Sequence, residues 1–239
     1  MSKKHLNEQV EKSYKHVNCE TCTSRVDGFF GQFTSEEVKE LNRFKSCQFY
    51  KKNQTIFVDG SFPRGVYCIN HGKVKVYALG DEGKEQIVHI AKEGEVVGFR
   101  AMLSGQAYRL SATTLEDANI CFIPKEFFLN ILDKNVNLRN SLIQKLSEEL
   151  GERAIFITNL AQKTVRERLA YSLLVLMEIY GDDPINLSRE DLANFVGTAT
   201  ETLIRLLKDF KEEGLIDTQA RKIFIQNKEG LFALAGWHS

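Results

Sequence analysis

The chain has 239 residues, of which 43% are hydrophobic and 27% are charged, a composition typical of a folded globular protein. Basic and acidic residues both total 32, so the net charge neither indicates nor excludes nucleic acid as a partner. No apolar run approaches the ~20 residues of a membrane-spanning helix, and the polar first residues contain no export signal. We therefore expect a cytoplasmic protein with no membrane contact, whose five cysteines favour metal or redox roles over structural disulfides.

The first 30 residues are polar and carry Cys19 and Cys22 in a Cys-Glu-Thr-Cys motif, a spacing that suits metal ligation or redox chemistry. Thr34, placed three residues ahead of Glu37, predicts a capping box at the start of a short helix. We therefore separate residues 1–30, as a cysteine-containing segment, from the domain that follows.

Residues 31–137 are predicted to form a β-roll sensor domain. Short apolar runs are separated by glycine-containing turns, and residues 73–76 alternate with the period of two that a half-buried strand shows. The expected strands are Thr55–Val58, Val66–Ile69, Val74–Leu79, Gln86–Ile90, Val96–Phe99 and Ile120–Ile123. Many short strands at this spacing favour a jelly-roll-like closed sheet, and the helices that follow make the chain an α+β protein.

Beyond Pro124 the apolar residues recur with the period of a helix, and residues 138–162 are predicted to be a dimerisation helix. The side chains expected at the dimer interface are Ile143, Leu146, Leu150, Arg153, Ile157 and Leu160. Their narrow stripe is typical of a coiled-coil seam, and Arg153 occupies its one position that is not apolar. In a homodimer Arg153 would approach its counterpart and weaken the dimer, unless Glu149 or Glu152 neutralises it.

Residues 163–239 are predicted to form a DNA-binding domain that begins with a helix over residues 165–180, ended by Gly181. Ser188 is expected to cap the next helix, and Gly197 to end it in a tight turn. Helix, glycine turn and second helix are the parts of a helix-turn-helix motif.

The second helix of this motif is predicted to open at a capping box formed by Thr198 and Glu201. Leu203, Leu206, Leu207 and Phe210 would face inward. Two short apolar strands on either side of the polar turn around Gln219 and Ala220 would then form a wing.

The outer face of the second helix is expected to read DNA bases. Arg205 is suited to a bidentate pair with guanine, and Glu201 to a hydrogen bond from the cytosine amine. Simpler explanations exist, because Glu201 would complete the capping box and Arg205 could be a solvated surface charge. The complete motif favours DNA contact, for which the predicted residues are Arg189, Thr198, Thr200, Glu201, Arg205 and Lys208.

The charge of this domain does not favour tight DNA binding by a single chain. Residues 163–239 contain ten lysines and arginines against twelve aspartates and glutamates, a net charge of −2. Because phosphate contacts dominate affinity, specific binding would depend on dimerisation and on a few placed cations. These are Arg189, Arg205, Lys208, Lys211, Arg221 and Lys222.

The order of β-roll, seam helix and winged helix-turn-helix resembles the CRP/FNR family of bacterial transcription regulators, from about residue 19 onward. Residues 72–90, 94–105 and 187–216 carry the resemblance most specifically. It implies a homodimeric regulator that binds inverted-repeat DNA and contacts RNA polymerase, with Glu201 and Arg205 at base-contacting positions. It implies no enzymatic activity.

In family members that bind cyclic nucleotides, a glutamate follows a Gly-Glu-x-x-Gly turn and an Arg-Ser pair holds the phosphate. Here Phe99 and Leu110 occupy the glutamate and serine positions, and only Arg109 is retained. A phenylalanine cannot accept the ribose hydroxyl hydrogen bonds, so we expect no cyclic nucleotide to bind.

The FNR branch of the family senses oxygen through an iron–sulfur cluster on four cysteines. Cys19, Cys22 and Cys121 match three of these positions, and Gly28 occupies the remaining one. Cys47 is expected to substitute, because the first strand of such a roll commonly pairs with the last, which holds Cys121. The resemblance thus implies a 4Fe–4S cluster on Cys19, Cys22, Cys47 and Cys121.

Alternatives remain open at this stage. The Cys-x-x-Cys motif could bind zinc or form a thiol switch, Asp27 is another candidate ligand, and Cys68 is expected to be an ordinary core residue. The regulator could also respond to another small effector or to none, with structural cysteines. A cyclic-nucleotide module without DNA binding is disfavoured by the winged helix, and the scattered histidines disfavour a metal-dependent enzyme.

Overall fold

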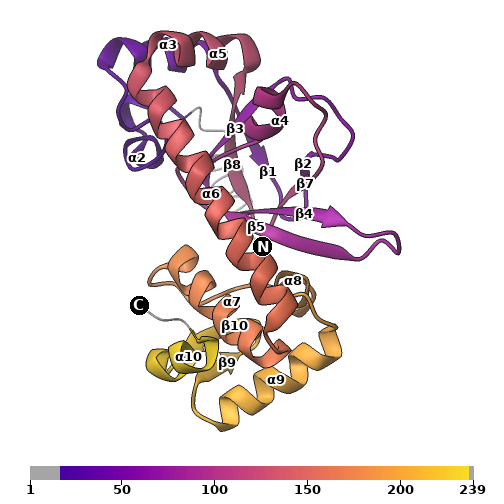
Figure 1. Ribbon diagram of the computed structural model, residues 1–239. Helices are drawn as coiled ribbons and strands as arrows, with labels where there is room; N and C mark the ends of the chain where they lie inside the picture. Colours follow the sequence, from indigo (N-terminus) through magenta and orange to yellow (C-terminus); the bar gives the residue numbers. More distant parts are fainter. Residues whose placement is uncertain (1–16, 237–239) are drawn as a thin grey trace, which may run out of the picture. The chain divides into compact units, whose positions relative to one another are not determined.

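The computed structural model describes residues 17–236 (Figure 1). These residues form two compact units. The first runs up to Val76 and resumes at Ile90–Lys145, and the second comprises Tyr77–His89 together with the chain from Leu146 onward. A hairpin of the roll is therefore grouped with the C-terminal helices.

Three helical segments precede the roll: η1 (Cys19–Thr21), α2 (Thr23–Val26) and α3 (Ser35–Phe44). The predicted capping box of α3 is confirmed, since the Thr34 hydroxyl accepts the Glu37 N–H and the Glu37 carboxylate accepts the Thr34 N–H. In Figure 1, α3 lies beside α5 (Lys125–Lys134), where the Phe44 and Phe127 rings stack with centroids 4.7 Å apart.

The roll consists of two four-stranded sheets. The first has the order β1 (Ser46–Tyr50), β8 (Ala118–Pro124), β3 (Gly65–His71) and β6 (Val96–Val97). The second has the order β2 (Thr55–Phe57), β7 (Ser111–Thr114), β4 (Val74–Leu79) and β5 (Glu85–Ala91). The first strand pairs with the last, as expected, and the pairing is antiparallel.

The sequence missed two elements of the roll. Strand β7 is fully buried but contains only serine, alanine and threonine, so it lacks the large apolar residues that identify a strand. Phe99 was expected to end a strand, but it begins helix α4 (Phe99–Ser104). Gly98 adopts a positive φ of 90° and turns the chain after two strand residues.

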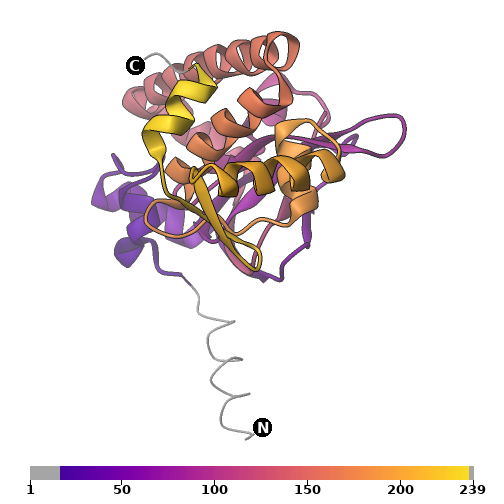
Figure 2. The same ribbon diagram turned by 90° about the horizontal axis from the view of Figure 1, so that it is seen from below.

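The C-terminal part is helical, with a two-stranded wing. Its elements are α6 (Val136–Gln162), α7 (Val165–Tyr180), α8 (Arg189–Val196), α9 (Thr200–Glu212), β9 (Ile216–Gln219), β10 (Lys222–Ile225) and α10 (Lys228–Ala235). Helix α10 packs on α7 and the wing packs beside α9 (Figures 1 and 2). Among the described residues, no helix is both long and apolar enough to cross a membrane.

The inward face of α9 is as predicted for three of its four side chains. Leu203, Leu207 and Phe210 are buried, whereas Leu206 is only half-buried. Burying an apolar side chain of this size stabilises a fold by about 1.5–3 kcal/mol. This anchored stripe therefore leaves the opposite face of α9 available to a partner.

Candidate DNA-binding surface and thiol site

The two helices of the helix-turn-helix are joined by a tight turn at Gly197. Ser188 caps α8 by accepting the Asp191 N–H at 2.9 Å, as predicted. Gly197 ends that helix in the left-handed conformation, with φ 75°. The N–H groups of Gly197 and Thr198 both donate to the Ala193 carbonyl, so the backbone of the turn is satisfied.

A side chain that sequence reasoning did not identify holds this turn in place. The guanidinium of Arg168, on α7, donates to the carbonyl oxygens of Val196 at 3.1 Å, Gly197 at 3.0 Å and Lys163 at 2.9 Å. The Arg168 guanidinium therefore binds backbone carbonyls at the C-terminal end of α8 and the carbonyl of the residue that follows α6. Because all its acceptors are backbone atoms, no pattern of residue types could have revealed this role.

The predicted capping box at the start of α9 is wrong. The N-cap residue is Ala199, which has no side chain able to accept a hydrogen bond, and Thr198 lies buried in the turn. The helix starts one residue later than expected, so Thr198 and Glu201 do not have the required positions. The structure thereby removes capping as the simpler explanation for the exposed Glu201.

Three of the predicted DNA-contacting residues share the exposed face of α9. Glu201, Arg205 and Lys208 are four and three residues apart and all are exposed, while Thr200 is half-buried beside them. The Lys208 ammonium lies 3.6 Å from the Glu212 carboxylate, a surface pair that leaves it accessible. The exposed face of α9 therefore presents an acceptor near the helix N-terminus and two cations farther along the helix.

Arg189 and Lys211 both contact the wing in this structure. The Arg189 guanidinium donates to the carbonyl oxygens of Ala220 and Arg221, both at 3.2 Å, which holds the wing turn. Lys211 forms a 2.7 Å ion pair with Asp217 of β9. Among the predicted cations of the wing, Arg221 and Lys222 remain exposed at its tip.

On α6, the apolar stripe predicted as a dimer seam faces solvent at every seventh position. The exposed fractions are 57% for Ile143, 74% for Leu150 and 64% for Ile157. Leu146, Arg153 and Leu160 are half-buried. The Arg153 guanidinium donates to the Val88 carbonyl of β5, so it is engaged within its own chain. Its repulsion from a partner's Arg153 stays a prediction.

The cysteines gather on one region of the first sheet. Cys47 of β1 and Cys121 of β8 are register partners, with Cα atoms 4.0 Å apart, and their sulfurs form a disulfide. Cys68 of β3 is the register partner of Cys121 on the other side. The three side chains therefore form a row across three adjacent strands. Cys68, expected to be an ordinary core residue, is half-buried and belongs to this row.

The N-terminal segment brings the remaining two cysteines to the same region. The Asn70 amide, on β3, donates to the Cys22 sulfur at 3.1 Å, and the Ser24 hydroxyl donates to the Asn70 carbonyl at 2.6 Å. Cys19 is buried, and its N–H donates to the Asn42 side chain at 3.1 Å. The sequence pattern placed Cys19 and Cys22 on a polar tail and did not anticipate this anchoring.

Burial and charge act in opposite directions on these groups. Burial raises the pKa of the Cys68 thiol to about 12, with nearby Cys22 and Cys19 adding to the effect. Burial also raises the pKa of Cys19, while Lys45 and Arg25 lower it. Lys45 is a buried lysine whose pKa is lowered by burial and raised by the same thiols. The region thus combines thiols with compensating cations.

Within residues 17–236, no three His, Cys, Asp or Glu side chains converge closely enough to hold a single metal ion. The expected ligands Cys47 and Cys121 are instead bonded to each other. Any metal centre on Cys121 therefore requires that this disulfide be reduced first.

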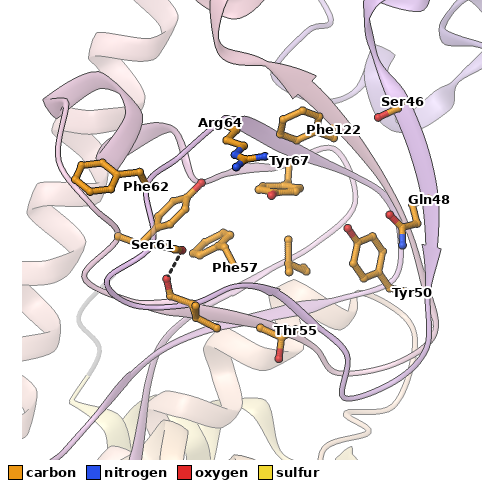
Figure 3. A pocket seen from close by; sticks show the side chains of 13 residues that line it. Ser46, Gln48, Tyr50, Thr55, Phe57, Ser61, Phe62, Arg64, Tyr67 and Phe122 are labelled. Carbon is orange, nitrogen blue, oxygen red and sulfur yellow. Dashed lines mark hydrogen bonds between the residues drawn. The ribbon is translucent and has the colours of Figure 1, made fainter.

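The roll also contains a pocket of about 500 Å³, a volume within the range of small-molecule sites (Figure 3). Phe57, Tyr67 and Phe122 line it with their rings. Phe99 and Leu110, at the family's nucleotide-contacting positions, do not belong to its lining residues. Phe99 is buried at the start of α4 and has no group that could hold a ribose.

The two-sheet roll and the exposed α9 behind a glycine turn define the class as a DNA-binding regulator. Residues 47–135 match the cyclic nucleotide-binding domain model, and residues 167–234 match the Crp-like helix-turn-helix domain model. The chain belongs to the CRP/FNR family of transcription regulators, whose members are not enzymes and are typically dimeric.

Individual relatives support this assignment. The chain is 30% identical over 228 residues to the fumarate and nitrate reduction regulatory protein of Salmonella typhimurium, covering 92% of this chain and 91% of that protein. The Escherichia coli K12 protein of the same name matches at the same identity and coverage. FixK2 from Bradyrhizobium japonicum has a similar fold, with a TM-score of 0.74 and 24% identity, covering 82% of this chain and 99% of that one.

Proposed function

We propose that this chain is a cytoplasmic, homodimeric, redox-responsive transcription regulator whose sensor is the cysteine region of the roll. The observation that supports this most directly is the gathering of five cysteines around one region of the first sheet. In a reducing compartment, clustered cysteines are more often metal-binding or redox-active than structural. A 4Fe–4S cluster, as the family resemblance implies, is the proposed cofactor.

The donor set fits such a cluster by its chemistry. Iron–sulfur clusters are held by cysteine thiolates, and hydrogen bonds to the sulfurs and local charge tune them. Here thiols of the roll and of the N-terminal segment lie near Lys45 and Arg25, whose charges would offset thiolates. The Asn70 amide already donates to Cys22. Cys19, Cys22 and Cys121 are proposed as ligands, together with a fourth donor for which the sequence offers Cys47.

When bound, such a cluster would supply an oxygen-sensitive redox centre. The protein's own part is to connect the sensor region to DNA binding, through dimerisation along the exposed stripe of α6. A two-fold dimer would present two copies of α9 to inverted half-sites with centres ~34 Å apart. Contact with RNA polymerase is proposed from the resemblance alone.

The decisive experiment is anaerobic purification followed by iron and sulfide analysis, visible absorption and DNA binding with and without air. We expect iron and sulfide in equal amounts, visible charge-transfer bands, and weaker DNA binding after exposure to air. A colourless, iron-free protein whose DNA affinity is the same with and without air would overturn the redox proposal.

Cyclic nucleotides are not proposed as effectors, because Phe99 and Leu110 lack the polar groups that a nucleotide needs. Titration calorimetry with cAMP and cGMP should show no binding in the micromolar range. The aromatic pocket of about 500 Å³ favours the second candidate, a regulator that binds another small effector in the roll.

A further inference from the structure

Cys121 has a cysteine neighbour on each side, and the two neighbours differ. Cys47 on β1 is bonded to it, whereas Cys68 on β3 is a free thiol. Directly opposed residues of antiparallel strands project to the same face of a sheet. Either neighbour is therefore placed to share a ligand role with Cys121, and the sequence by itself named only Cys47.

Backbone geometry separates the two neighbours. The 4.0 Å between the Cα atoms of Cys47 and Cys121 is typical of a pair that is not hydrogen-bonded. A residue in a central antiparallel strand directs its N–H and C=O to one neighbour only, which for Cys121 is then β3. Hydrogen-bonded pairs are wider, at about 5.5 Å between Cα atoms. We therefore expect the Cα atoms of Cys68 and Cys121 to lie farther apart than those of Cys47 and Cys121.

Cys22, the second cysteine of the N-terminal motif, is anchored on the Cys68 side of the row. Asn70, two residues after Cys68, donates to the Cys22 sulfur, and Ser24 donates to the Asn70 carbonyl. Strand β1 lies beyond β8 from this anchor, so Cys47 is two strands away from β3, or roughly 10 Å. Cys22 therefore has Cys68 as its nearer partner in the row.

Cys47 is engaged in a disulfide that would have to be opened before its sulfur could bind iron. Its sulfur accepts a 2.9 Å hydrogen bond from the Lys45 ammonium and is bonded to Cys121. Cys68 carries a free thiol in this structure.

We propose that Cys68 is the fourth ligand, completing the set Cys19, Cys22, Cys68 and Cys121, and that Cys47 is not a ligand. The inference rests on the proposed iron–sulfur function and names its ligands. Cys47 instead competes for Cys121 by forming the disulfide. Opening that bond takes two electrons and two protons from a dithiol reductant, after which Cys121 is available as a thiol.

The test compares substitutions of the two cysteines that flank Cys121. Wild type, Cys68→Ser and Cys47→Ser are reduced with dithiothreitol and reconstituted anaerobically with ferrous iron and sulfide. Loss of a supporting residue around a metal site already costs about 10- to 100-fold in affinity. We expect Cys68→Ser to lose at least about tenfold in bound iron at limiting iron concentration, and Cys47→Ser to match wild type.

The outcomes separate the two proposals. Loss of iron in Cys47→Ser with retention in Cys68→Ser would overturn the inference and return the role to Cys47. Retention in both variants would overturn it as well. Absence of iron from wild type would instead refute the proposed function, and the ligand assignment with it.

A second measurement does not depend on whether Cys68→Ser folds. Wild-type protein carrying iron is alkylated anaerobically with N-ethylmaleimide, before and after iron removal by a chelator, and the cysteines are mapped by mass spectrometry. Cys47 should react equally in both states, while Cys22 becomes reactive only after iron removal. Protection of Cys47 that is lost with the iron would contradict the inference.

Discussion

The Arg168 guanidinium donates a 3.0 Å hydrogen bond to the carbonyl of Gly197, the residue that turns the chain between the two DNA-binding helices. The same guanidinium binds the carbonyls of Val196 and Lys163. A charged donor at this point fixes the angle at which α9 leaves the turn. We therefore expect DNA affinity to depend on a residue that lies outside the helix-turn-helix.

Replacing Arg168 by alanine should lower the free energy of unfolding by about 2–3 kcal/mol, because three backbone carbonyls lose a charged donor. DNA affinity should fall for all sequences alike, since Arg168 touches no base. Thermal unfolding and binding to a library of sites would measure both effects.

Arg166→Ala is the matched control, because Arg166 lies on the same helix, pairs with Glu213 and lies over the Phe210 ring, 4.9 Å from its centroid. Such ion pairs contribute about 0–1 kcal/mol, and cation–π contacts at exposed sites about 0.5–1 kcal/mol. If both variants were equally stable, the Arg168 contacts would have no special importance.

Glu201→Ala should relax discrimination at one base pair and leave the stability of the protein within about 0.5 kcal/mol. Ala199, not Thr198, is the N-cap, so no capping box is lost. Arg205→Ala should cost about 1–3 kcal/mol at the paired guanine. Affinity measurements on single-base variants of the site, with thermal melts, would test this. A destabilised Glu201→Ala protein with unchanged base preference would show that this residue only supports the helix.

Leu150→Glu should convert a dimer into monomers without unfolding the chain. Leu150 is 74% exposed, so the substitution removes little buried surface within one chain but places two like charges at the proposed seam. Analytical ultracentrifugation gives the oligomeric state. Thr158→Glu, on an exposed position next to the stripe, should remain dimeric. If the Leu150→Glu protein remained dimeric, the α6 stripe would not be the dimer interface.

Ala220→Gly should stabilise the wing by about 0.5–1 kcal/mol. Ala220 adopts φ 53° in the wing turn, a conformation that costs a residue with a Cβ about 1–2 kcal/mol and that glycine adopts freely. The greater entropy of glycine in the unfolded chain offsets part of the gain. Denaturant unfolding should show a higher midpoint for the variant, and a lower one would contradict the prediction.

Local patterns in the sequence were sufficient for much of the fold. The helix over residues 165–180, the Ser188 cap and the wing strands were predicted close to their observed bounds. Each depends on interactions within a few residues, which spacing and residue type encode directly. The start of α9 was misplaced by one residue, because Thr198 and Glu201 have the spacing of a capping box without being used as one.

The sequence by itself determined the family and the exposed face of α9, since these follow from periodicity and short motifs. Only the tertiary structure decided that Arg168 holds the turn, that Cys68 flanks Cys121 and that Cys22 is anchored on β3. Cys68 and Cys121 are far apart in the sequence, and their meeting depends on strand order and register. Those properties emerge when whole sheets pack, because a shift of one residue would send every side chain of a strand to the opposite face.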